Sequence, residues 1–416
     1  MSRVLIAGAG LFGVTAALEL RRRGHDVALL DPGRVPRPEA ASTDVSKIVR
    51  LDYGADEPSM ELMERALEGW RAWNRRWAAR GLEPLFHEDG LLVMTRAPMA
   101  PGGFEHDSYH LLRQRSHRPA RIDRAALTAS HPGWNPALWA DGYFNPEGGW
   151  AESGAVVARL AAEAREAGVE LHEGRAFARL LEEGGRVAGL ATERPSDSPD
   201  RSPRLLVHRA DHVLVTAGAW TPVLLPWLAP DLRVVGQPVL LFRPAQPERW
   251  RAPQFPPFTA DVARTGFYGF PALPDGTLKI ARHGAGRRVH PDAPRAVDPG
   301  EEAAFRAFLA EAFPGLADAP LVGTRLCLYC DTADGHFWID HDPQRPGLVV
   351  ATGDSGHAFK FAPVLGALIA DVLERRDDPT TRAWRRRCAW RAAGADRASS
   401  AGDAARALTP EPPVSR

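Results

Sequence analysis

The sequence predicts an α/β fold, in which a Rossmann-type domain is joined to a second, mixed α+β domain that carries an antiparallel sheet. Near the N-terminus, an apolar strand from Val4 to Ala7, a glycine-rich turn and an apolar-periodic helix lead to a second strand that ends at Asp31. Residues 226–325 are instead rich in proline and in β-type segments. A late strand, glycine turn and apolar helix, in GLVVATGDSGHAFKF, would return the chain to the first sheet.

The glycine-rich turn, GAGLFG, predicts a dinucleotide site because strand, turn, helix, strand and acid follow one another in the required order. Gly8 permits the tight turn, Gly10 lets the backbone approach a pyrophosphate, and Gly13 allows the helix to pack closely on the strand. Asp31 lies 18 residues after Gly13, where a ribose hydroxyl would need an acceptor. An adventitious glycine-rich turn is the alternative.

The elements between these regions complete the expected architecture. A long amphipathic helix is expected over 60–80, where Trp70, Trp73 and Trp77 recur at helical spacing and fit core packing better than a ligand cage. Further helices are expected at 153–168, 299–313 and 360–373, a polar excursion at a hairpin tip at 193–204, and a disordered tail at 391–416. The nucleotide-binding domain is expected to consist of residues 1–84, 148–225 and 325–390, and the second, substrate domain of residues 85–147 and 226–324.

The composition describes an ordinary globular protein. The chain has 416 residues, 44% of them hydrophobic and 25% charged, with a formal net charge of zero. Zero net charge gives no electrostatic reason to expect nucleic acid as a partner, and no apolar run approaches the roughly 20 residues of a membrane helix. Three cysteines do not make a disulfide framework. We therefore expect a cytoplasmic protein, a monomer, with no membrane partner.

The basic residues are distributed very unevenly between the two types. The chain has forty-nine arginines and only three lysines, which are Lys47, Lys279 and Lys360. Lysine offers a compact ammonium whose pKa can be tuned, whereas arginine offers a planar fork that stays charged. The three lysines lie in DVSKIVR, YGFPALPDGTLKIARH and TGDSGHAFKF. They predict chemistry that involves an anion, a reduced cofactor or oxygen; chance survival of lysines at the surface is the alternative.

Cys327 and Cys330 form a single C-x-x-C motif in RLCLYCDT. A zinc site would need a second pair or nearby histidines. A redox pair of the thioredoxin type usually sits at the start of a helix, whereas this segment is expected to be extended. A cysteine thioether to a flavin and two ordinary buried cysteines are the other possibilities, and the pattern alone does not choose among the four.

The segment GLVVATGDSGHAFKF is expected to form a strand, a turn and a helix. Gly353 and Gly356 free the backbone, so that the amide groups of Ser355 to Ala358 could face a ligand at the positive end of the helix. Such an end would favour the anionic reduced form of a flavin. His357 could take part in binding or could be only a local hydrogen-bonding residue.

Tyr268, Lys279 and His283 lie on successive strand-like segments of the second domain. Strand alternation places Lys279, Ala281 and His283 on one face of the sheet. A lysine and a histidine that point the same way suit the wall of an active site. A solvated strand face is the alternative.

Together these segments resemble the D-amino-acid-oxidase-like flavoprotein superfamily, and within it the monomeric sarcosine oxidase branch, which includes N-methyltryptophan, pipecolate and fructosyl-amino-acid oxidases. The resemblance runs from Arg3 to about Leu373. Its most specific motifs are CLYCDTADGHFWID and VVATGDSGHAFKFAPVLG, and YGFPALPDGTLKIARH matches the branch at even spacing. The resemblance implies FAD as the cofactor, bound by the Rossmann-type domain, and an amino acid and O2 as the small-molecule partners.

The resemblance also implies roles for individual residues. Cys327 stands where these enzymes attach FAD covalently, and Lys279 where a lysine promotes the reduction of oxygen. Lys47 stands where sarcosine oxidases have an arginine on the flavin face. The residues implied to line the substrate pocket are Tyr268, His283 and Tyr329, with Arg50 and Lys360 gripping the substrate carboxylate. The residues implied to contact the cofactor are Gly8, Gly10, Gly13, Asp31, Ser46, Cys327, Gly353, Gly356, His357 and Lys360.

Two departures from the sarcosine pattern leave the substrate open. A His-His pair followed by an arginine near DTRIIR is replaced by STDVSKIVR, with Lys47 at the arginine, which is closer to fructosyl-amino-acid and fungal-type pipecolate or saccharopine oxidases. Asp354 occupies a position that is often apolar. It could meet a polar or cationic group of the substrate, or it could be a helix N-cap, which is the simpler interpretation.

We therefore predict an FAD-dependent amine oxidase that converts the C–N bond of a secondary amino acid, N-alkyl or cyclic, to an imine, with hydride transfer to flavin N5 and reduction of O2 to H2O2. Sarcosine, pipecolate, proline-like imino acids, larger N-alkylated amino acids and glycated amino acids all stay open as substrates. The alternatives are a dehydrogenase with another electron acceptor, a fructosyl-amino-acid (deglycating) oxidase, and a non-catalytic flavin- or NAD-binding module. An NAD-dependent dehydrogenase would leave the late motifs without a use.

Overall fold

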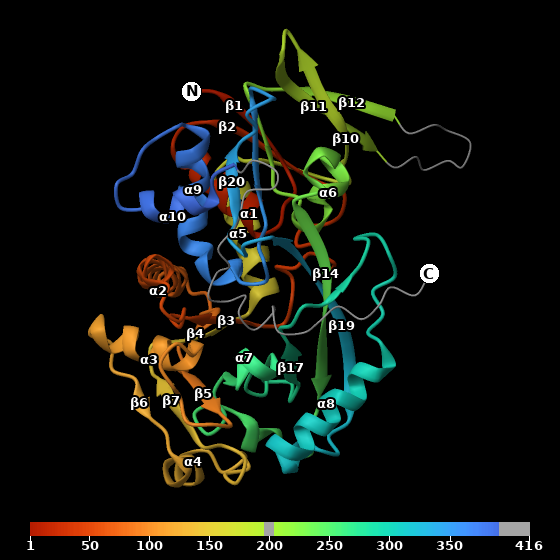
Figure 1. Cartoon of the computed structure of the whole chain (residues 1–416). Helices are drawn as coiled ribbons and strands as arrows, with labels where there is room; N and C mark the ends of the chain where they lie inside the picture. The colour runs from red at the N-terminus through yellow and green to blue at the C-terminus, as the bar shows by residue number, and fades with distance from the viewer. Residues whose placement is uncertain (195–203, 391–416) are drawn as a thin grey trace.

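The structure, a computed structural model, describes residues 1–194 and 204–390, and two large sheets dominate it (Figure 1). The first sheet has six strands in the order β20-β21-β13-β1-β2-β9. Its strands are β1 Arg3–Ala7, β2 Asp26–Asp31, β9 Glu170–Glu173, β13 His212–Val215, β20 Trp338–His341 and β21 Leu348–Thr352. All neighbours are parallel except β20, which runs antiparallel to β21. This arrangement confirms the predicted Rossmann-type sheet.

Both faces of this sheet are covered. One face packs on α1 Leu11–Arg22, α5 Ser153–Glu166 and α9 Ala362–Leu373, and α2 Glu57–Ala78 packs on α9. The other face lies against the small sheet of β10 Ala176–Glu183, β11 Arg186–Arg194 and β12 Arg204–Arg209. Alternate residues of β1 join the two separate cores, Val4 and Ile6 on the helix side and Leu5 and Ala7 on the other. Burial on both faces explains why these strands are apolar throughout.

The second large sheet has nine strands in the described part of the chain. They are β5 Leu91–Thr95, β6 Ala120–Arg121, β7 Asp141–Asn145, β14 Leu232–Phe242, β15 Phe258–Ala260, β16 Phe267–Gly269, β17 Leu278–Arg282, β18 Arg287–Arg288 and β19 Leu321–Thr332. The pairing is antiparallel except between β15 and β5. The long β14–β19 ribbon runs from this sheet up to the first (Figure 1) and so connects the two large sheets.

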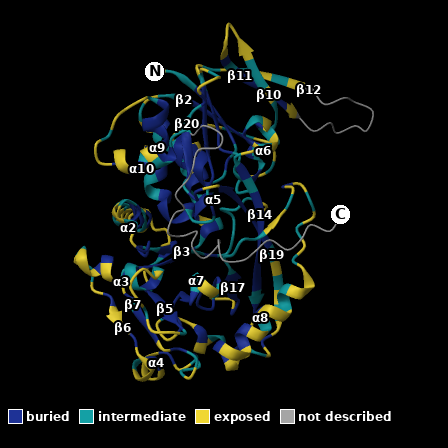
Figure 2. Ribbon diagram, in the orientation of Figure 1, coloured by how far each residue is buried: buried dark blue, intermediate teal, exposed yellow. Residues whose placement is uncertain are grey.

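The remaining elements are short or peripheral. A three-stranded sheet consists of β3 Lys47–Arg50, β4 Phe86–His87 and β8 Gly148–Ala151. The other helices are α3 Phe104–Gln114, α4 Arg124–Ser130, α6 Thr221–Leu224, α7 Val262–Thr265, α8 Pro299–Ala312 and α10 Arg382–Cys388. The 3-10 turns are η1 Gly218–Trp220, η2 Pro226–Leu228, η3 Pro247–Trp250, η4 Pro314–Leu316 and η5 Ala358–Phe361. Buried residues concentrate in the central strands and α9, whereas α8 and the β10–β12 hairpins carry exposed residues (Figure 2).

The long tryptophan-bearing helix begins earlier than the predicted residue 60. It starts at Glu57 because Asp56 caps it, accepting a hydrogen bond from the backbone of Ser59 at 3.2 Å. Trp70 and Trp77 are fully buried, which confirms that the stripe is core packing. The indole N–H of Trp70 also donates to the carbonyl oxygen of Lys360 at 2.7 Å. This core helix therefore holds the Lys360 segment in place.

The predicted helix over 360–373 is divided in two. A 3-10 turn, η5, precedes α9, in which Pro363 lies in the first turn, where a missing N–H is tolerated. The helices predicted over 153–168 and 299–313 are present and end slightly earlier, as α5 and α8. Most of the predicted polar excursion at 193–204, and the predicted disordered tail at 391–416, lie outside the described residues. In the described ranges, none of the helices combines the length and apolar character needed to span a bilayer.

Candidate functional site

A cavity of about 320 Å³ lies where β1, β2 and β13 end. The carboxyl ends of parallel strands are where ligands bind in open α/β sheets. Its wall includes residues from the glycine turn, from β2, from the loop before β3, and from β19 and the segment after β21; these are Gly8, Gly10, Asp31, Ser42, Lys47, Leu328, Tyr329, Asp354 and Gly356. The motifs that the sequence predicts to bind a dinucleotide therefore surround one cavity.

The three glycines of the turn differ in what surrounds the position of a Cβ atom. Gly8 has φ +109°, and a Cβ atom there would lie 2.6 Å from the carbonyl oxygen of Thr216. A Cβ atom on Gly13 would lie 1.9 Å from the carbonyl oxygen of Gly8. At Gly10 the nearest protein atom to such a Cβ is Ser42 Oγ at 3.6 Å, an ordinary contact. The protein itself does not require glycine at residue 10, so the missing side chain leaves room in the cavity.

Asp31 is fixed at the cavity wall by two backbone amides. Its carboxylate accepts hydrogen bonds from Ala9 N and Gly33 N, both at 2.9 Å. Burial raises the pKa of Asp31, and these two hydrogen bonds oppose that shift. The acid at the end of β2 is thus held beside the glycine turn, in the place where a ribose acceptor was predicted.

A second cavity, of about 110 Å³, adjoins the first. Four residues line both cavities, namely Lys47, Tyr329, Gly356 and Phe359. The smaller cavity also brings together most of the predicted pocket residues, which are Arg50, Tyr268, His283, His357 and Lys360. Two molecules bound in the two cavities would meet at the shared wall.

Two basic side chains, Arg50 and Lys360, lie together in the wall of the smaller cavity. Lys360 Nζ donates to Tyr53 Oη and to the carbonyl oxygen of His357, both at 3.1 Å. Burial, followed by the charge of Arg50, places the pKa of Lys360 well below its ordinary value. Arg50 Nη1 is buried and has no hydrogen-bond partner among the described residues. Because a buried donor without a partner is costly, the pair fits a negatively charged ligand.

Tyr53, which the sequence did not single out, connects Lys360 to His357. Its hydroxyl lies 3.1 Å from His357 Nδ1, and His357 Nε2 lies 2.9 Å from the carbonyl oxygen of Gly335. A carbonyl can only accept, so Nε2 carries the proton, Nδ1 accepts from Tyr53, and Tyr53 accepts from Lys360. Burial and the charge of Lys360 lower the pKa of His357 well below its ordinary value. His357 is therefore neutral, and both its ring nitrogens bond to protein groups, which fits the interpretation of a local hydrogen-bonding residue.

Lys279 and Cys327 lie close to Lys47, one of the residues of the shared wall. Lys279 Nζ lies 2.7 Å from Asp44 Oδ2 and 2.6 Å from the carbonyl oxygen of Ser46. Lys47 Nζ lies 3.3 Å from the same carboxylate and 3.6 Å from Cys327 Sγ. Burial lowers the pKa of Lys279 to about 8, although Asp44 opposes this shift. Burial also acts on Lys47, but Cys327 and Asp44 outweigh it, and the pKa of Lys47 is raised.

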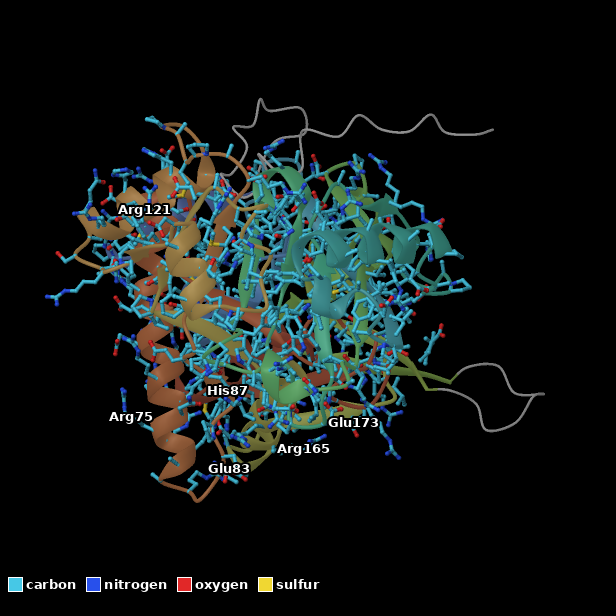
Figure 3. The ribbon with its side chains drawn as sticks, turned by 90° about the horizontal axis from the view of Figure 1, so that it is seen from below. Arg75, Glu83, His87, Arg121, Arg165 and Glu173 are labelled. Atoms are coloured by element: carbon cyan, nitrogen blue, oxygen red, sulfur yellow. The ribbon has the colours of Figure 1, made fainter. Side chains whose placement is uncertain are left out.

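None of the three lysines is exposed. The relative exposure is 1% for Lys279 and 5% for Lys360, and the side chain of Lys47 is 15% exposed. Arginine instead is common at the surface, where Arg75 and Arg121, labelled in Figure 3, are both exposed. Chance survival of surface lysines is therefore wrong as an explanation, because all three are inside the protein and beside one pair of cavities.

The aromatic wall of the smaller cavity depends on Gly356. Tyr268 and Tyr329 share a side-chain hydrogen bond, and the rings of His283 and Tyr329 are 5.8 Å apart. Gly356 has φ +72°, and a Cβ atom there would lie 2.2 Å from the ring of Tyr329. Lys279 and Ala281 lie buried on β17, and His283 follows its last residue. The face predicted by strand alternation is thus an interior wall and not a solvated surface.

Cys327 and Cys330 point into different parts of the molecule. Both lie on the extended strand β19, and neither forms a disulfide. Cys327 packs with Tyr329 and Val235, whereas Cys330 packs with Trp338 and its Sγ lies 3.5 Å from Thr352 Oγ1. No cluster of metal-ligating side chains occurs in the part of the chain that the structure describes. The geometry therefore favours separate roles for the two cysteines over a redox pair or a zinc site.

Two predictions for the segment after β21 are wrong in detail. Of the amide groups predicted to face a ligand, Ser355 N donates to the carbonyl of Cys330 at 3.1 Å and His357 N to the carbonyl of Asp354 at 2.9 Å. Asp354 is not a helix cap: its side chain accepts a hydrogen bond from Cys330 N at 2.8 Å and so joins this segment to β19. Local sequence could not show this, because the partner strand lies earlier in the chain.

Other functional candidates were missed because nothing local distinguishes them. Asp44 is three residues before Lys47, and Tyr53 is three residues after Arg50. The available signal was that each is a polar residue close in sequence to a predicted site residue. Phe104, from α3, and Thr259, from β15, line the smaller cavity from distant parts of the sequence. Ser46, a predicted cofactor contact, is fully buried, and its Oγ has no hydrogen-bond partner among the described residues.

A cavity at the glycine turn that adjoins a second cavity lined by Arg50 and Lys360 fits a flavin-dependent oxidoreductase. The chain belongs to the family of FAD dependent oxidoreductases denoted DAO, whose pattern matches residues 3–372. The predicted class of enzyme is therefore confirmed. The residues present also fit FAD, because the glycine turn leaves space at Gly10 and the braced carboxylate of Asp31 lies beside it.

Several proteins that this chain resembles in sequence or structure are oxidases. Monomeric sarcosine oxidase of Bacillus sp. (strain B-0618) is 27% identical over 376 residues, which cover 89% of this chain and 91% of that protein. L-saccharopine oxidase of Schizosaccharomyces pombe is 29% identical over 425 residues, covering 92% and 93%. The crystal structure of fructosyl amine: oxygen oxidoreductase (Amadoriase I) from Aspergillus fumigatus superposes with a TM-score of 0.76 at 26% identity, covering 94% and 89%.

Proposed function

We propose that this protein is an FAD-dependent amine oxidase that oxidises the C–N bond of a secondary amino acid, N-alkyl or cyclic, to an imine and passes the electrons to O2. The observation that carries the proposal is the pairing of the two cavities: Arg50 and Lys360 form an anion site in the smaller one, and its wall at Lys47 and Tyr329 is shared with the dinucleotide cavity. The similarity to sarcosine, saccharopine and fructosyl-amine oxidases supports the same class of substrate.

The cation pair would orient the substrate. A carboxylate placed between Arg50 and Lys360 accepts charge-assisted hydrogen bonds, which give the buried Nη1 of Arg50 a partner. Because Lys360 is braced by Tyr53 and by Trp70, the carboxylate is held on a rigid support. Fixing one end of the substrate converts binding energy into correct placement of the reacting carbon.

Cationic and aromatic groups around the same cavity prepare the amine. FAD, when bound, supplies the two-electron acceptor for the C–N bond. A secondary amine must be neutral to lose hydride, and the nearby charges of Lys47 and Arg50 disfavour its protonated form. Phe104, Tyr268 and Phe359 line the cavity and exclude water from it.

We assign the oxygen reaction to Lys279. Reduction of O2 passes through negatively charged oxygen species, and a buried ammonium stabilises such charge more strongly than one in water. Lys279 is 1% exposed and lies next to Lys47, which lines both cavities. An electron acceptor other than oxygen would not need this buried ammonium, so Lys279 favours an oxidase over a dehydrogenase.

We further propose a covalent thioether between FAD and Cys327. Cys327 is 1% exposed, and its sulfur lies 3.6 Å from Nζ of Lys47, which is a residue of the wall that the two cavities share. Cys330 is on the opposite side of β19 with Trp338.

We also propose the three-part FAD-binding domain and the two-part substrate domain described above. We propose a cytoplasmic monomer, and light scattering on the purified protein measures the oligomeric state.

A fructosyl-amino-acid oxidase is the second candidate. The DVSKIVR segment, with Asp44 and Lys47 in one ion pair, is the observation that favours it, together with the similarity to Amadoriase I. A peroxide-coupled screen of the purified yellow protein over sarcosine, pipecolate, proline, larger N-methyl amino acids and fructosyl amino acids separates the two. Peroxide from one class identifies the substrate. No peroxide from any of them, with bleaching of the flavin under anaerobic conditions, would contradict the oxidase assignment.

A further inference from the structure

Asp44 is the one acidic side chain that both Lys47 and Lys279 contact in the described structure. Its Oδ2 atom lies 2.7 Å from Lys279 Nζ and 3.3 Å from Lys47 Nζ. The side chains of Asp44 and Lys279 are 3% and 1% exposed. A buried lysine and a partly buried one thus share one carboxylate. Buried charges need such a partner, because removing one member of a buried pair leaves the other uncompensated.

The backbone of Asp44 is itself held rigidly. Ser153 Oγ donates to the carbonyl oxygen of Asp44 at 2.8 Å and lies 3.2 Å from its amide nitrogen. Gly154 N donates to the same carbonyl at 2.9 Å. Ser153 and Gly154 begin α5, so the first turn of that helix fixes the loop before β3. The carboxylate is therefore a fixed point to which side chains from two different sheets, on β3 and β17, are tied.

The other groups around Lys279 do not replace this carboxylate. Lys47 adds a second positive charge, and Arg325 adds a further one near Asp44 and Lys47. Cys327 faces both lysines, and Tyr268 faces Lys47. Beside Lys279 itself lie the neutral carbonyl of Ser46 and the ring of Phe270, whose centroid is 4.7 Å from Nζ. Among these groups, Asp44 is the fixed negative charge.

We propose that Asp44 is a positioning residue for the oxidase reaction, which holds the Lys279 ammonium against the Ser46 carbonyl and keeps it protonated while Lys47 competes for the same carboxylate. This inference rests on the proposed function for the identity of the reaction, but the effect of Asp44 on the charge of Lys279 does not depend on it. Burial raises the pKa of Asp44, yet the charges of Lys279 and Lys47 hold it well below its ordinary value. The carboxylate is therefore ionised throughout the working range of pH.

The two members of the cluster should affect Lys279 in opposite directions. In Asp44→Asn, a buried ammonium loses its counter-charge and still faces Lys47, so its pKa falls further below about 8. In Lys47→Met, the repulsion disappears and Asp44 serves Lys279 alone, so the pKa of Lys279 rises. A residue that merely filled space would not produce shifts of opposite sign.

The scarcity of lysine makes this measurable directly. Protein labelled with ¹³C at lysine Cε contains signals from three side chains, from Lys47, Lys279 and Lys360, which single Lys→Met variants assign. Titration of the purified full-length enzyme gives the pKa of each. We expect Asp44→Asn to lower the pKa of Lys279 by about one unit or more, Asp44→Glu to restore it in part, and Lys47→Met to raise it.

The controls separate this inference from the proposed function. An unchanged Lys279 titration in Asp44→Asn would overturn the role of Asp44, and if that variant does not fold, a Lys47→Met variant without a raised pKa would overturn it equally. Reoxidation of the reduced enzyme is measured on the same samples. If the pKa moves as expected but the pH dependence of reoxidation does not follow it, the assignment of Lys279 to the oxygen reaction fails while the control of its charge by Asp44 stands.

Discussion

The pH dependence of reoxidation is the prediction that most directly tests the chemistry assigned to Lys279. Burial places the pKa of this lysine at about 8. Its ammonium form is the one that stabilises negatively charged oxygen, so the rate constant should be high below this pKa and should fall as the pH rises through it. With a pKa of about 8, roughly nine-tenths of the molecules carry the charge at pH 7 and roughly one-tenth at pH 9. The rate constant should therefore fall about tenfold between these pH values.

The substitution Lys279→Met should remove this dependence. Loss of one preorganised charge stabiliser in an active site costs about 10²- to 10³-fold in rate, so the variant should be slow at every pH. The assay is stopped-flow mixing of dithionite-reduced enzyme with oxygenated buffer from pH 6 to 10, which bypasses substrate oxidation. Lys360→Met is the matched control, since it removes a buried lysine that lines the smaller cavity and does not contact Asp44, and it should keep the wild-type profile. A Lys279→Met enzyme that shows the wild-type profile would refute the reasoning.

Three further predictions concern the cofactor bond and the substrate cavity. Cys327→Ser should release the flavin into the supernatant on acid precipitation, whereas Cys330→Ser, on the other side of β19, should keep it in the pellet; pigment in the pellet of Cys327→Ser would place the bond elsewhere. Lys360→Met should raise the KM for the amino acid about 10- to 100-fold through the lost charge-assisted hydrogen bond, and an unchanged KM in steady-state assays would remove Lys360 from the carboxylate site. Gly356→Ala should displace Tyr329, because its Cβ would lie 2.2 Å from that ring at a φ of +72°; turnover should drop sharply with folding retained by circular dichroism, and full activity would show that the ring is not part of the site.

Much of the fold follows from patterns that are local in the sequence. The glycine turn between Val4 and Asp31 predicts a Rossmann-type unit because each step of that unit has its own residue requirement, and the structure has the strands and helix in that order. The tryptophan stripe of α2 is correctly predicted as core because helical spacing alone puts Trp70 and Trp77 on one side. The apolar repeat predicts that α2 starts at residue 60, later than its observed start at Glu57, because the cap at Asp56 precedes the repeat.

The candidate site divides in the same way. Motifs around Lys47, Lys279 and Lys360 identify the segments that carry chemistry, since a lysine in an arginine-rich chain is informative by itself. Their shared environment is not visible there: Asp44 lies in the loop before β3 and Lys279 lies on β17 of another sheet, and they meet only because β3 and β17 are brought together. Sequence therefore named the lysines but not the carboxylate that joins two of them.

The sequence by itself determined the class of fold, the dinucleotide cradle and the segments that carry the three lysines, because each depends on residues near one another in the chain. Only the tertiary structure decided what those residues touch. The partner of Asp354 is the backbone of Cys330, and the amides of Ser355 and His357 are already bonded to carbonyl groups. Such contacts depend on how distant strands pack, and the energy that selects them comes from burying apolar surface across the whole domain and not from any local pattern.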